Sequence, residues 1–159
     1  MNLSVVSLEK DDENVIIGQA HFIKTVEDLF EAVKNSSPSA KFGIAFCEAS
    51  GKRLIRFDGN DEILMRRAID NAKRIGAGHV FIIHLADSFP INLIPHIRNV
   101  PEVVGLYAAT SNPVSVVIGE EGNQRGVMGI LDGETPLGVE GKGDIEERKK
   151  FLRDIGYKR

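Results

Sequence analysis

Alternation of large and small side chains marks one segment of the chain as a central β-strand. Between residues 41 and 49, Phe42, Ile44 and Phe46 alternate with a glycine, an alanine and a cysteine. A period of two places the large and the small set on opposite faces of a strand. The pattern therefore predicts a buried strand, with a helix or a neighbouring subunit packed closely against its small face.

Seven further segments rich in β-branched and aromatic residues are predicted to be strands. They are residues 2–9, 14–18, 53–58, 79–85, 103–109, 114–119 and 126–131. The charged turn at 10–13 predicts that the first two of these segments pair as a hairpin. The Ser50-Gly51 turn predicts a second hairpin, between 41–49 and 53–58.

Four segments with apolar residues at helical spacing are predicted to be helices. They cover residues 25–34, 60–75, 90–100 and 144–155. Thr25, Asn60 and Asp144 are the predicted N-caps, and Gly76 is placed to end the second helix in a left-handed conformation. Helices mixed with strand hairpins favour an α+β fold with a mixed β-sheet. Without repeats or linkers, residues 1–159 are expected to form a single domain.

Composition excludes some classes of function but does not identify the function itself. The net charge is −3 at neutral pH, which disfavours a nucleic-acid polymer as partner. No apolar run approaches the ~20 residues that span a bilayer, so no membrane contact is expected. Cys47 is the only cysteine, which excludes an intrachain disulfide and a cysteine-rich zinc site. With no leader pattern at the N-terminus, these features predict a cytoplasmic protein.

The familiar phosphate-binding and hydrolase motifs are absent. The chain has no G-x-x-x-x-G-K-[ST], no G-x-G-x-x-G after a strand and no G-x-S-x-G. These absences disfavour a P-loop NTPase, a classical dinucleotide-binding domain and a standard α/β-hydrolase. The sequence therefore shows no recognisable backbone cradle for several linked phosphates.

His21 is the histidine whose position suggests chemistry. It lies just before the predicted helix at Thr25, whose free N–H groups would attract a phosphate, and Lys24 adds a positive charge. An imidazole there could act as acid, base or phosphoryl acceptor. The alternative is a side chain that only packs under the loop. The other three histidines are interpreted as structural, because no two have the spacing of metal ligands.

Polar residues in loops after strands are further candidates. Glu48, Asn112, Arg125 and Asp132 each lie at or beside a strand end. Polar side chains at such positions can bind a ligand. Each also has a structural alternative, as a turn residue or, for Glu48, as the partner of a nearby arginine.

Four blocks of the sequence resemble the adenosine-specific kinase family, whose small proteins occur mainly in archaea. The blocks are residues 18–28 (GQAHFIKTVED), 41–51 (KFGIAFCEASG), 89–92 (FPIN) and 125–133 (RGVMGILDG). The resemblance implies a single α+β domain, assembly as a homotrimer, binding of adenosine or AMP, and a histidine that can carry phosphate. His21 matches that histidine. The binding roles assigned to Lys24, Glu48, Asn112, Arg125 and Asp132 are inferred from their chemistry.

Two interpretations of the function follow. The first is a phosphotransferase that acts on adenosine through a phosphohistidine at His21, in which Mg²⁺ could accompany the phosphoryl donor and be held by Asp132 or Glu48. The alternative is a non-catalytic sensor of adenosine or AMP, with Phe22 or Tyr107 against the adenine ring. An enzyme that acts on a different small molecule is a third possibility.

Overall fold

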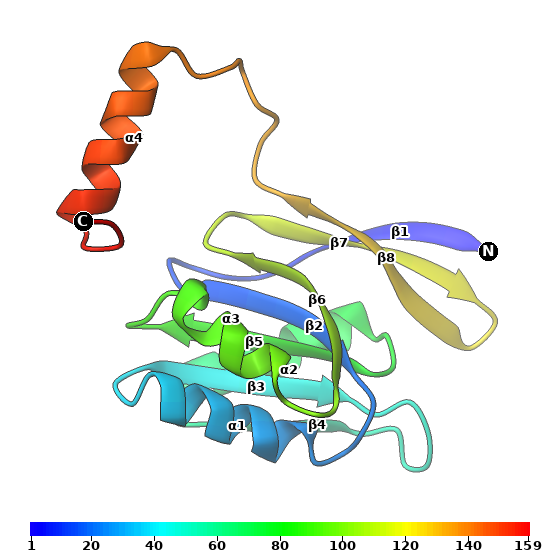
Figure 1. The fold of residues 1–159 in the computed structure, drawn as a ribbon. Helices are drawn as coiled ribbons and strands as arrows, with labels where there is room; N and C mark the ends of the chain where they lie inside the picture. The colour runs from blue at the N-terminus through cyan, green and yellow to red at the C-terminus, as the bar shows by residue number, and fades with distance from the viewer.

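A five-stranded antiparallel sheet runs through the middle of the molecule (Figure 1), and the computed structural model describes all 159 residues. Its strand order is β4-β3-β5-β2-β6. The bounds are β4 (Ile55–Gly59), β3 (Lys41–Cys47), β5 (Val80–Ala86), β2 (Asn14–Ala20) and β6 (Val103–Thr110). A second antiparallel sheet has the order β1-β7-β8, with β1 (Asn2–Ser7), β7 (Val114–Glu121) and β8 (Gln124–Asp132).

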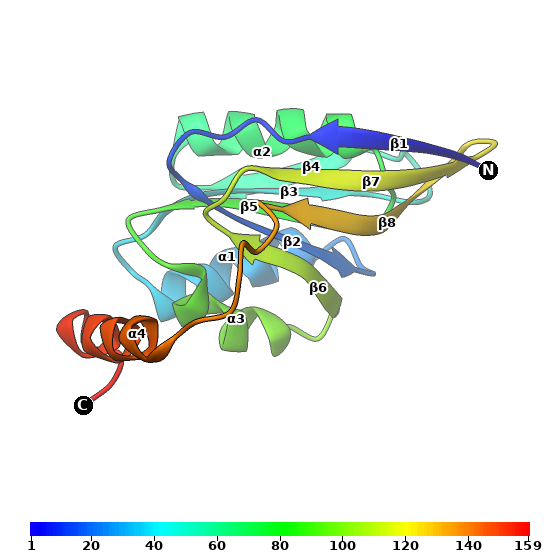
Figure 2. The ribbon, with the colours of Figure 1, turned by 90° about the horizontal axis from the view of Figure 1, so that it is seen from above.

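Three of the four helices pack on the five-stranded sheet, and the fourth lies apart from it. Their bounds are α1 (Thr25–Ser36), α2 (Glu62–Ile75), α3 (Pro90–Arg98) and α4 (Lys142–Asp154). Figure 2 shows α1 and α3 on one side of the sheet and α2 on the other. The single α+β domain with four helices is confirmed. The expected mixed sheet is wrong, because every strand pair is antiparallel and the strands form two sheets.

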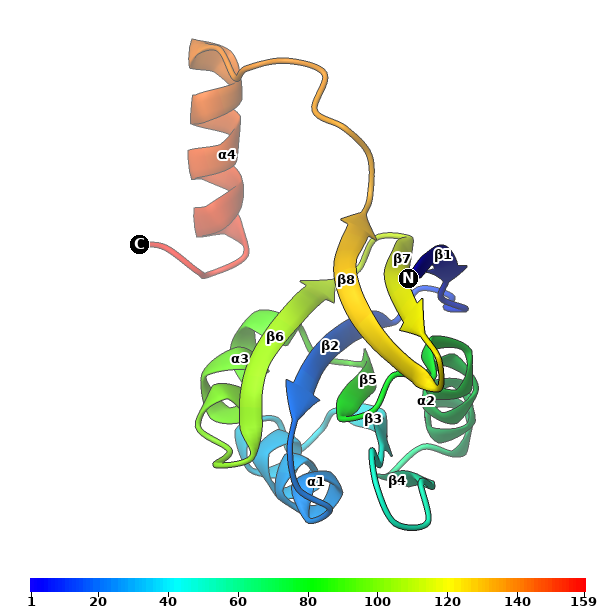
Figure 3. The same ribbon diagram turned by 90° about the vertical axis from the view of Figure 1, so that its right-hand side faces the viewer.

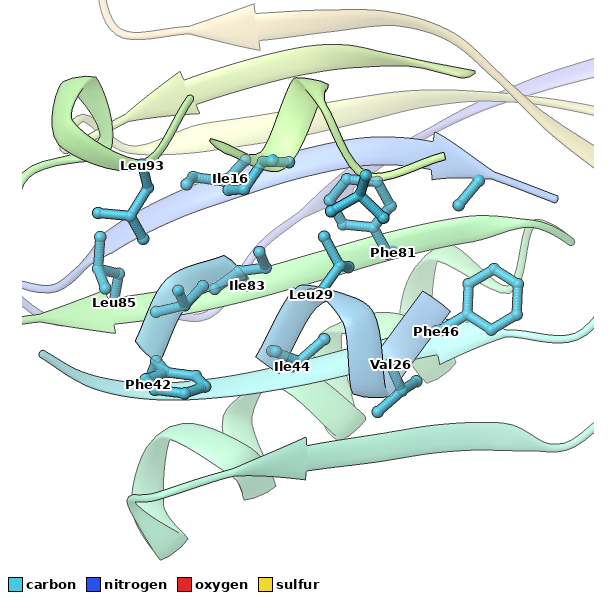
Figure 4. Close-up of a cluster of buried hydrophobic side chains, with 14 of the residues drawn as sticks. Ile16, Val26, Leu29, Phe42, Ile44, Phe46, Phe81, Ile83, Leu85 and Leu93 are labelled. Atoms are coloured by element: carbon cyan, nitrogen blue, oxygen red, sulfur yellow. The ribbon is translucent and has the colours of Figure 1, made fainter. Parts of the chain in front are cut away.

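The two faces of β3 behave as their side-chain sizes predict. Phe42, Ile44 and Phe46 join a core of buried residues beneath α1 and α3 (Figure 4). The small face packs against α2, and a Cβ added at Gly43 would lie only 2.2 Å from the Met65 backbone nitrogen. A helix of the same chain therefore covers this face, which leaves no room there for a neighbouring subunit.

The predicted hairpin between the first two strands is wrong. β1 pairs with β7, and β2 pairs with β5 on one edge and β6 on the other. Val15, Ile16 and Ile17 are fully buried, so β2 needs cover on both faces and both edges, whereas β1 is largely exposed. The predicted hairpin between β3 and β4 is confirmed.

Three predicted helix caps are wrong. The N-cap of α1 is Lys24, because the Thr25 hydroxyl donates to the Phe22 carbonyl instead of accepting from the helix. The Asn60 amide accepts from the Phe42 N–H and donates to the Ala40 carbonyl at the start of β3. The carboxylate of Asp61 caps α2 instead.

At α4, Asp144 lies inside the first turn, and its carboxylate accepts from the Gly141 N–H at 2.7 Å. In contrast, Gly76 ends α2 with φ +58°, as predicted. The α2 end is predictable because only glycine adopts this backbone conformation without cost.

The C-terminal arm, residues 133–159, leaves the body of the molecule (Figure 1). Residues 133–141 are all exposed and α4 has no buried residue. Leu137 and Val139 are fully exposed. No helix of the chain is both long and apolar enough to cross a membrane.

Candidate functional site

One end of the five-stranded sheet brings together the ends of β2 and β3 and the beginning of β5. The backbone of His79 joins them: the Ala20 N–H donates to the His79 carbonyl at 2.9 Å, and the His79 N–H donates to the Cys47 carbonyl at 2.7 Å. The β7–β8 turn also lies at this end, which faces the viewer in Figure 3. We call it the His21 end, because His21 and Glu48 directly follow β2 and β3.

His21 is exposed and makes no side-chain hydrogen bond, while its N–H donates to the Glu102 carbonyl at 3.2 Å. The loop that follows leads directly into α1. In this loop and the first turn, the N–H groups of Ile23, Lys24, Val26 and Glu27 donate to no acceptor in the protein. Free N–H groups at a helix N-terminus attract an anion. The structure therefore places His21 beside a turn whose backbone N–H groups have no acceptor in the chain.

Lys24 is less available than the sequence suggested. Its Nζ lies 2.7 Å from Glu102 Oε1 and 3.2 Å from Asp28 Oδ2. These carboxylates, Glu102 first, raise the pKa of Lys24. To contact a phosphate, Lys24 has to leave two acidic partners.

Glu102 is a feature of the site that sequence reasoning missed. Its side chain is 3% exposed, and Oε2 has no hydrogen-bond partner. Burial alone would raise the pKa of Glu102, but Lys24, the backbone and Asp28 together outweigh burial and keep the pKa below its usual value. An ionised, buried oxygen without a donor can accept a hydrogen bond from a ligand hydroxyl. Nothing in the sequence distinguishes Glu102 from a surface residue of a turn.

Glu48 and Arg125 line the same cleft, although 77 positions separate them in the chain. The cleft has a volume of about 650 Å³ and lies between the β3–β4 loop, the end of α2 and the β7–β8 turn. Glu48 accepts from the Leu54 N–H at 2.8 Å and from Arg56 Nε at 2.9 Å. The hydrogen bond from Leu54, then Arg56, lowers the pKa of Glu48. The proposed partner role of a nearby arginine is thus confirmed for Arg56.

Cys47 also lines this cleft, but it is a poor nucleophile. Its side chain is buried, and burial raises the pKa of the thiol to about 11. At neutral pH the sulfur is therefore protonated, and the reactive thiolate is scarce.

Asn112 and Asp132 lie at the opposite end of the sheet, beside the start of β2. Asp132 Oδ1 accepts from the Thr110 hydroxyl at 2.7 Å and from Asn112 Nδ2 at 3.1 Å. β2 has seven residues, and its six steps of ~3.3 Å separate the two ends by about 20 Å. One chain therefore cannot bring all six predicted residues to one ligand.

A groove of about 770 Å³ adjoins this opposite end. Its walls include Phe89 and Ile91 from the start of α3, and Phe151 and Tyr157 from the arm. The groove is more apolar than the cleft at the His21 end. It is also the place where the arm approaches the body of the molecule.

His79 is a second residue that the sequence interpretation passed over. It has φ +66° although it is not glycine, and its ring stacks on Phe46 with centroids 6.2 Å apart. Non-glycine residues in this conformation are uncommon and occur often at functional sites. The sequence shows glycines at 76 and 78, but it does not indicate that His79 adopts a positive φ.

The two carboxylates that the sequence suggested as Mg²⁺ ligands lie far from each other. Glu48 is at the His21 end and Asp132 is at the other. The chain holds no group of three or more histidine, cysteine, aspartate or glutamate side chains placed to bind a metal ion.

Comparisons with known proteins agree with the resemblance of the four sequence blocks. Residues 5–158 match the family described as adenosine specific kinase. Among solved structures, the PH1918 protein from Pyrococcus horikoshii OT3 is 41% identical, with a TM-score of 0.95 over 99% of this chain and 98% of that chain. No curated protein matches the chain.

Proposed function

The chain belongs to the adenosine-specific kinase family, and on that premise we propose that it transfers a phosphoryl group to adenosine through a phosphohistidine at His21. One observation carries the proposal: His21 is exposed beside four backbone N–H groups that have no acceptor. A phosphoryl group on the imidazole would find there the donors and the positive helix end that stabilise an anion.

The proposed reaction has two displacements. An imidazole nitrogen of His21 attacks the terminal phosphorus of the donor, so that a P–N bond forms and the P–O bond to the leaving phosphate breaks. A ribose hydroxyl of adenosine then attacks this phosphorus, the P–N bond breaks, and the hydroxyl proton passes to a carboxylate or to water. Positioning and neutralisation of charge supply most of the catalysis in such transfers.

Glu102 and Lys24 are the proposed positioning pair for the nucleoside. Glu102 Oε2, which lacks a partner, would accept from a ribose hydroxyl, and Lys24 would move from its carboxylates to the phosphoryl group as negative charge develops. Glu48 and Arg125 are proposed to contact the ligand from the cleft at the same end. Asn112 and Asp132 could reach this ligand only from a neighbouring copy of the chain.

The alternative function, a sensor that binds adenosine or AMP without turnover, has one observation in its favour. The Tyr107 hydroxyl donates to Gln19 Oε1 at 3.0 Å, two residues before His21, and its ring is partly exposed. Phe22 is half exposed in the loop itself. Either ring could stack on adenine.

A labelling experiment separates the two functions. The protein is incubated with ATP labelled at the terminal phosphate and with adenosine, and label is followed on AMP and on the protein. The enzyme is expected to form AMP and an acid-labile, base-stable adduct, and His21→Gln is expected to abolish both. His96→Gln is the matched control, because His96 is an exposed histidine on α3. Adenosine binding without any label would support the sensor, and full transfer by His21→Gln would exclude the proposed mechanism.

Assembly as a homotrimer is the second part of the proposal, and the C-terminal arm supports it. Leu137 and Val139 have no cover in a single chain, although exposed apolar surface of this kind marks interaction sites. A TM-score of 0.95 to the Pyrococcus protein over nearly the whole chain leaves no room for a different position of this 27-residue arm. A second copy of the chain is the proposed cover.

Light scattering tests the assembly. The full chain is expected at about three times its mass of 17.4 kDa, and the double variant Leu137→Asp, Val139→Asp at a lower mass. Substitution of two exposed residues should leave the far-UV circular dichroism unchanged. A monomeric wild-type chain at micromolar concentration, or an unchanged trimer of the variant, would overturn the role of the arm.

A further inference from the structure

The cleft at the His21 end concentrates positive charge in an acidic protein. Four cationic side chains line it, and Glu48 is its single acidic residue. The four are Lys52, Arg53, Lys73 and Arg125. Glu48 is already bound to Arg56 and a backbone N–H, and one carboxylate cannot balance four cations. A cleft lined by one sign of charge focuses the field and attracts ligands of the opposite sign.

These cations are incompletely paired. Lys52 and Arg53 form no ion pair in the chain, whereas Lys73 makes only an exposed contact with Asp70. Arg125 contacts Glu120 and the Arg74 carbonyl through its terminal nitrogens, but its Nε is buried without a partner. Buried donors in proteins normally have acceptors. The missing acceptor indicates that something else binds here.

The backbone around the cleft has the close approaches of a binding site. A Cβ at Gly76 would lie 2.7 Å from Arg125 Nη1, and a Cβ at Gly78 would lie 2.8 Å from the Ala49 side chain. Arg53 has φ +51°, a conformation that costs a non-glycine residue energy and that clusters at ligand sites. Glycine or asparagine would fit this turn better, so its arginine suggests a requirement for the charge.

The lining also limits what the ligand can be. No aromatic side chain lines the cleft and few of its residues are apolar, so it offers no stacking platform for a base. A volume of about 650 Å³ is more than one phosphate needs. The chemistry fits a flexible ligand with several negative charges in a row.

We propose that this cleft binds a chain of linked phosphates, the part common to a nucleoside triphosphate and an inorganic polyphosphate, and so holds the phosphoryl donor. This inference rests on the transfer proposed for His21. The cleft lies at the same end of the sheet, because Cys47 and Ala20 flank His79, about 10 Å apart at ~4.8 Å per strand. The sequence lacks a backbone cradle for phosphates, and the cleft supplies side chains in its place.

Calorimetry with sodium tripolyphosphate in the presence of Mg²⁺ tests the cleft directly. The full chain is expected to bind it, and the double variant Lys52→Ala, Arg53→Gly is expected to bind at least tenfold more weakly. Glycine at position 53 suits the positive φ, so the variant should keep the fold. The matched control is Lys149→Ala, Lys150→Ala, which removes the same charge from exposed positions on α4 and should change the affinity by less than twofold.

Two further measurements separate this inference from the proposed function. His21→Gln is expected to bind tripolyphosphate normally even if it transfers no phosphate. The cleft variant is expected to bind adenosine as the wild type does. If His21 does not carry phosphate but the cleft does bind linked phosphates, the wild type will still bind tripolyphosphate. The cleft variant will still bind it more weakly.

Parallel titrations with ATP and tripolyphosphate identify the source of the phosphates. Similar affinities for both, each lost in the cleft variant, would support inorganic polyphosphate as a ligand. Tighter binding of ATP that the cleft variant also weakens would support a nucleoside triphosphate. The proposal is overturned if the wild type does not bind tripolyphosphate at millimolar concentration, or if the cleft variant binds it as tightly as the control does.

Discussion

Both ends of the five-stranded sheet carry polar residues, but the hydrogen-bonding groups of the two ends are satisfied differently. At the His21 end, Glu102 Oε2 and Arg125 Nε are buried without partners, and the N–H groups that begin α1 have no acceptors. At the opposite end, Asp132 and its neighbours hydrogen-bond to one another. Buried polar groups without partners are costly, so the unsatisfied end is where a ligand contributes most.

A buried ionic network strengthens this contrast at the opposite end. His84 is fully buried, with Nδ1 2.9 Å from Glu13 Oε1 and Nε2 2.9 Å from Asn71 Nδ2. Because Asn71 Oδ1 already accepts from the Glu9 N–H, its Nδ2 donates to His84, and the His84 proton lies on Nδ1. Arg67 completes the network at 2.7 Å from Glu13. These charged groups satisfy one another and leave nothing for a ligand.

The largest difference between the ends is expected in turnover. His21→Gln should lower phosphate transfer to adenosine by roughly 10³-fold or more, because an amide cannot replace the nucleophile. Asp132→Asn should lower it by less than tenfold, because this carboxylate is bound by Thr110 and Asn112. Steady-state rates of AMP formation measure both. A comparable loss in Asp132→Asn would show that the opposite end also serves the reaction, from a neighbouring copy.

The next effect is on stability. Glu13→Ala leaves His84 and Arg67 without their buried partner, and breaking a buried ionic contact in this way costs roughly 3 kcal/mol. Chemical denaturation measures the loss, and Glu31→Ala, an exposed acid on α1, is the control. Adenosine binding by the folded Glu13→Ala protein should be unchanged. A loss below about 0.5 kcal/mol would show that the network is not the stabilising feature that its geometry indicates.

The same network predicts a dependence on pH. Burial lowers the pKa of His84 below its usual value of 6.5. Burial alone would raise the pKa of Glu13, but its hydrogen bonds to His84 and Arg67 outweigh this and keep the pKa low. Both groups therefore take up protons more readily in the unfolded chain, so stability falls as the pH falls.

For His84, this loss begins below about pH 6.5, and for Glu13 below about pH 4.5. Between pH 7 and pH 5 the loss from His84 should reach at most about 2 kcal/mol. Thermal unfolding at several pH values measures it, and His84→Gln should show a smaller decrease over the same range. A wild-type melting temperature that stays constant from pH 7 to pH 5 would contradict the buried neutral histidine.

The sequence predicted the local structure better than the pairing of its elements. The alternation in 41–47 fixed both faces of β3, and Gly76 marked the end of α2. The strand that pairs with β1 could not be predicted. β1 is a largely exposed edge strand, and its alternating residues are compatible with pairing to any strand that has an apolar face. Thr25, a common N-cap residue, turned its hydroxyl to the loop instead. The preference of threonine for the N-cap position was overridden here by the conformation of the loop between β2 and α1.

The candidate site shows the same limit. Glu48 and Arg125 were predicted because they lie beside strand ends, and His21 because it precedes the first helix. The antiparallel sheet brings these three positions to one side. Asn112 and Asp132 satisfy the same rule, but their strands end at the other side. Glu102 could not be found, because only the folded structure shows that its carboxylate is buried and lacks a partner.

The smallest expected effect tests whether Asp132 and its neighbours serve structure alone. The Thr110 hydroxyl donates to Asp132 Oδ1 and accepts from the Asn112 N–H at 3.0 Å, so it ties the end of β6 to the end of β8. Thr110→Val keeps the shape of the side chain and removes both bonds, which should cost about 1 kcal/mol. Thr135→Val, an exposed threonine of the arm, is the control and should change stability very little. Because the His21 end is untouched, adenosine affinity should stay within twofold of the wild type. A variant that keeps its melting temperature but binds adenosine tenfold more weakly would reverse the assignment, since a hydroxyl that contacts ligand matters for binding and one that ties two strands matters for folding.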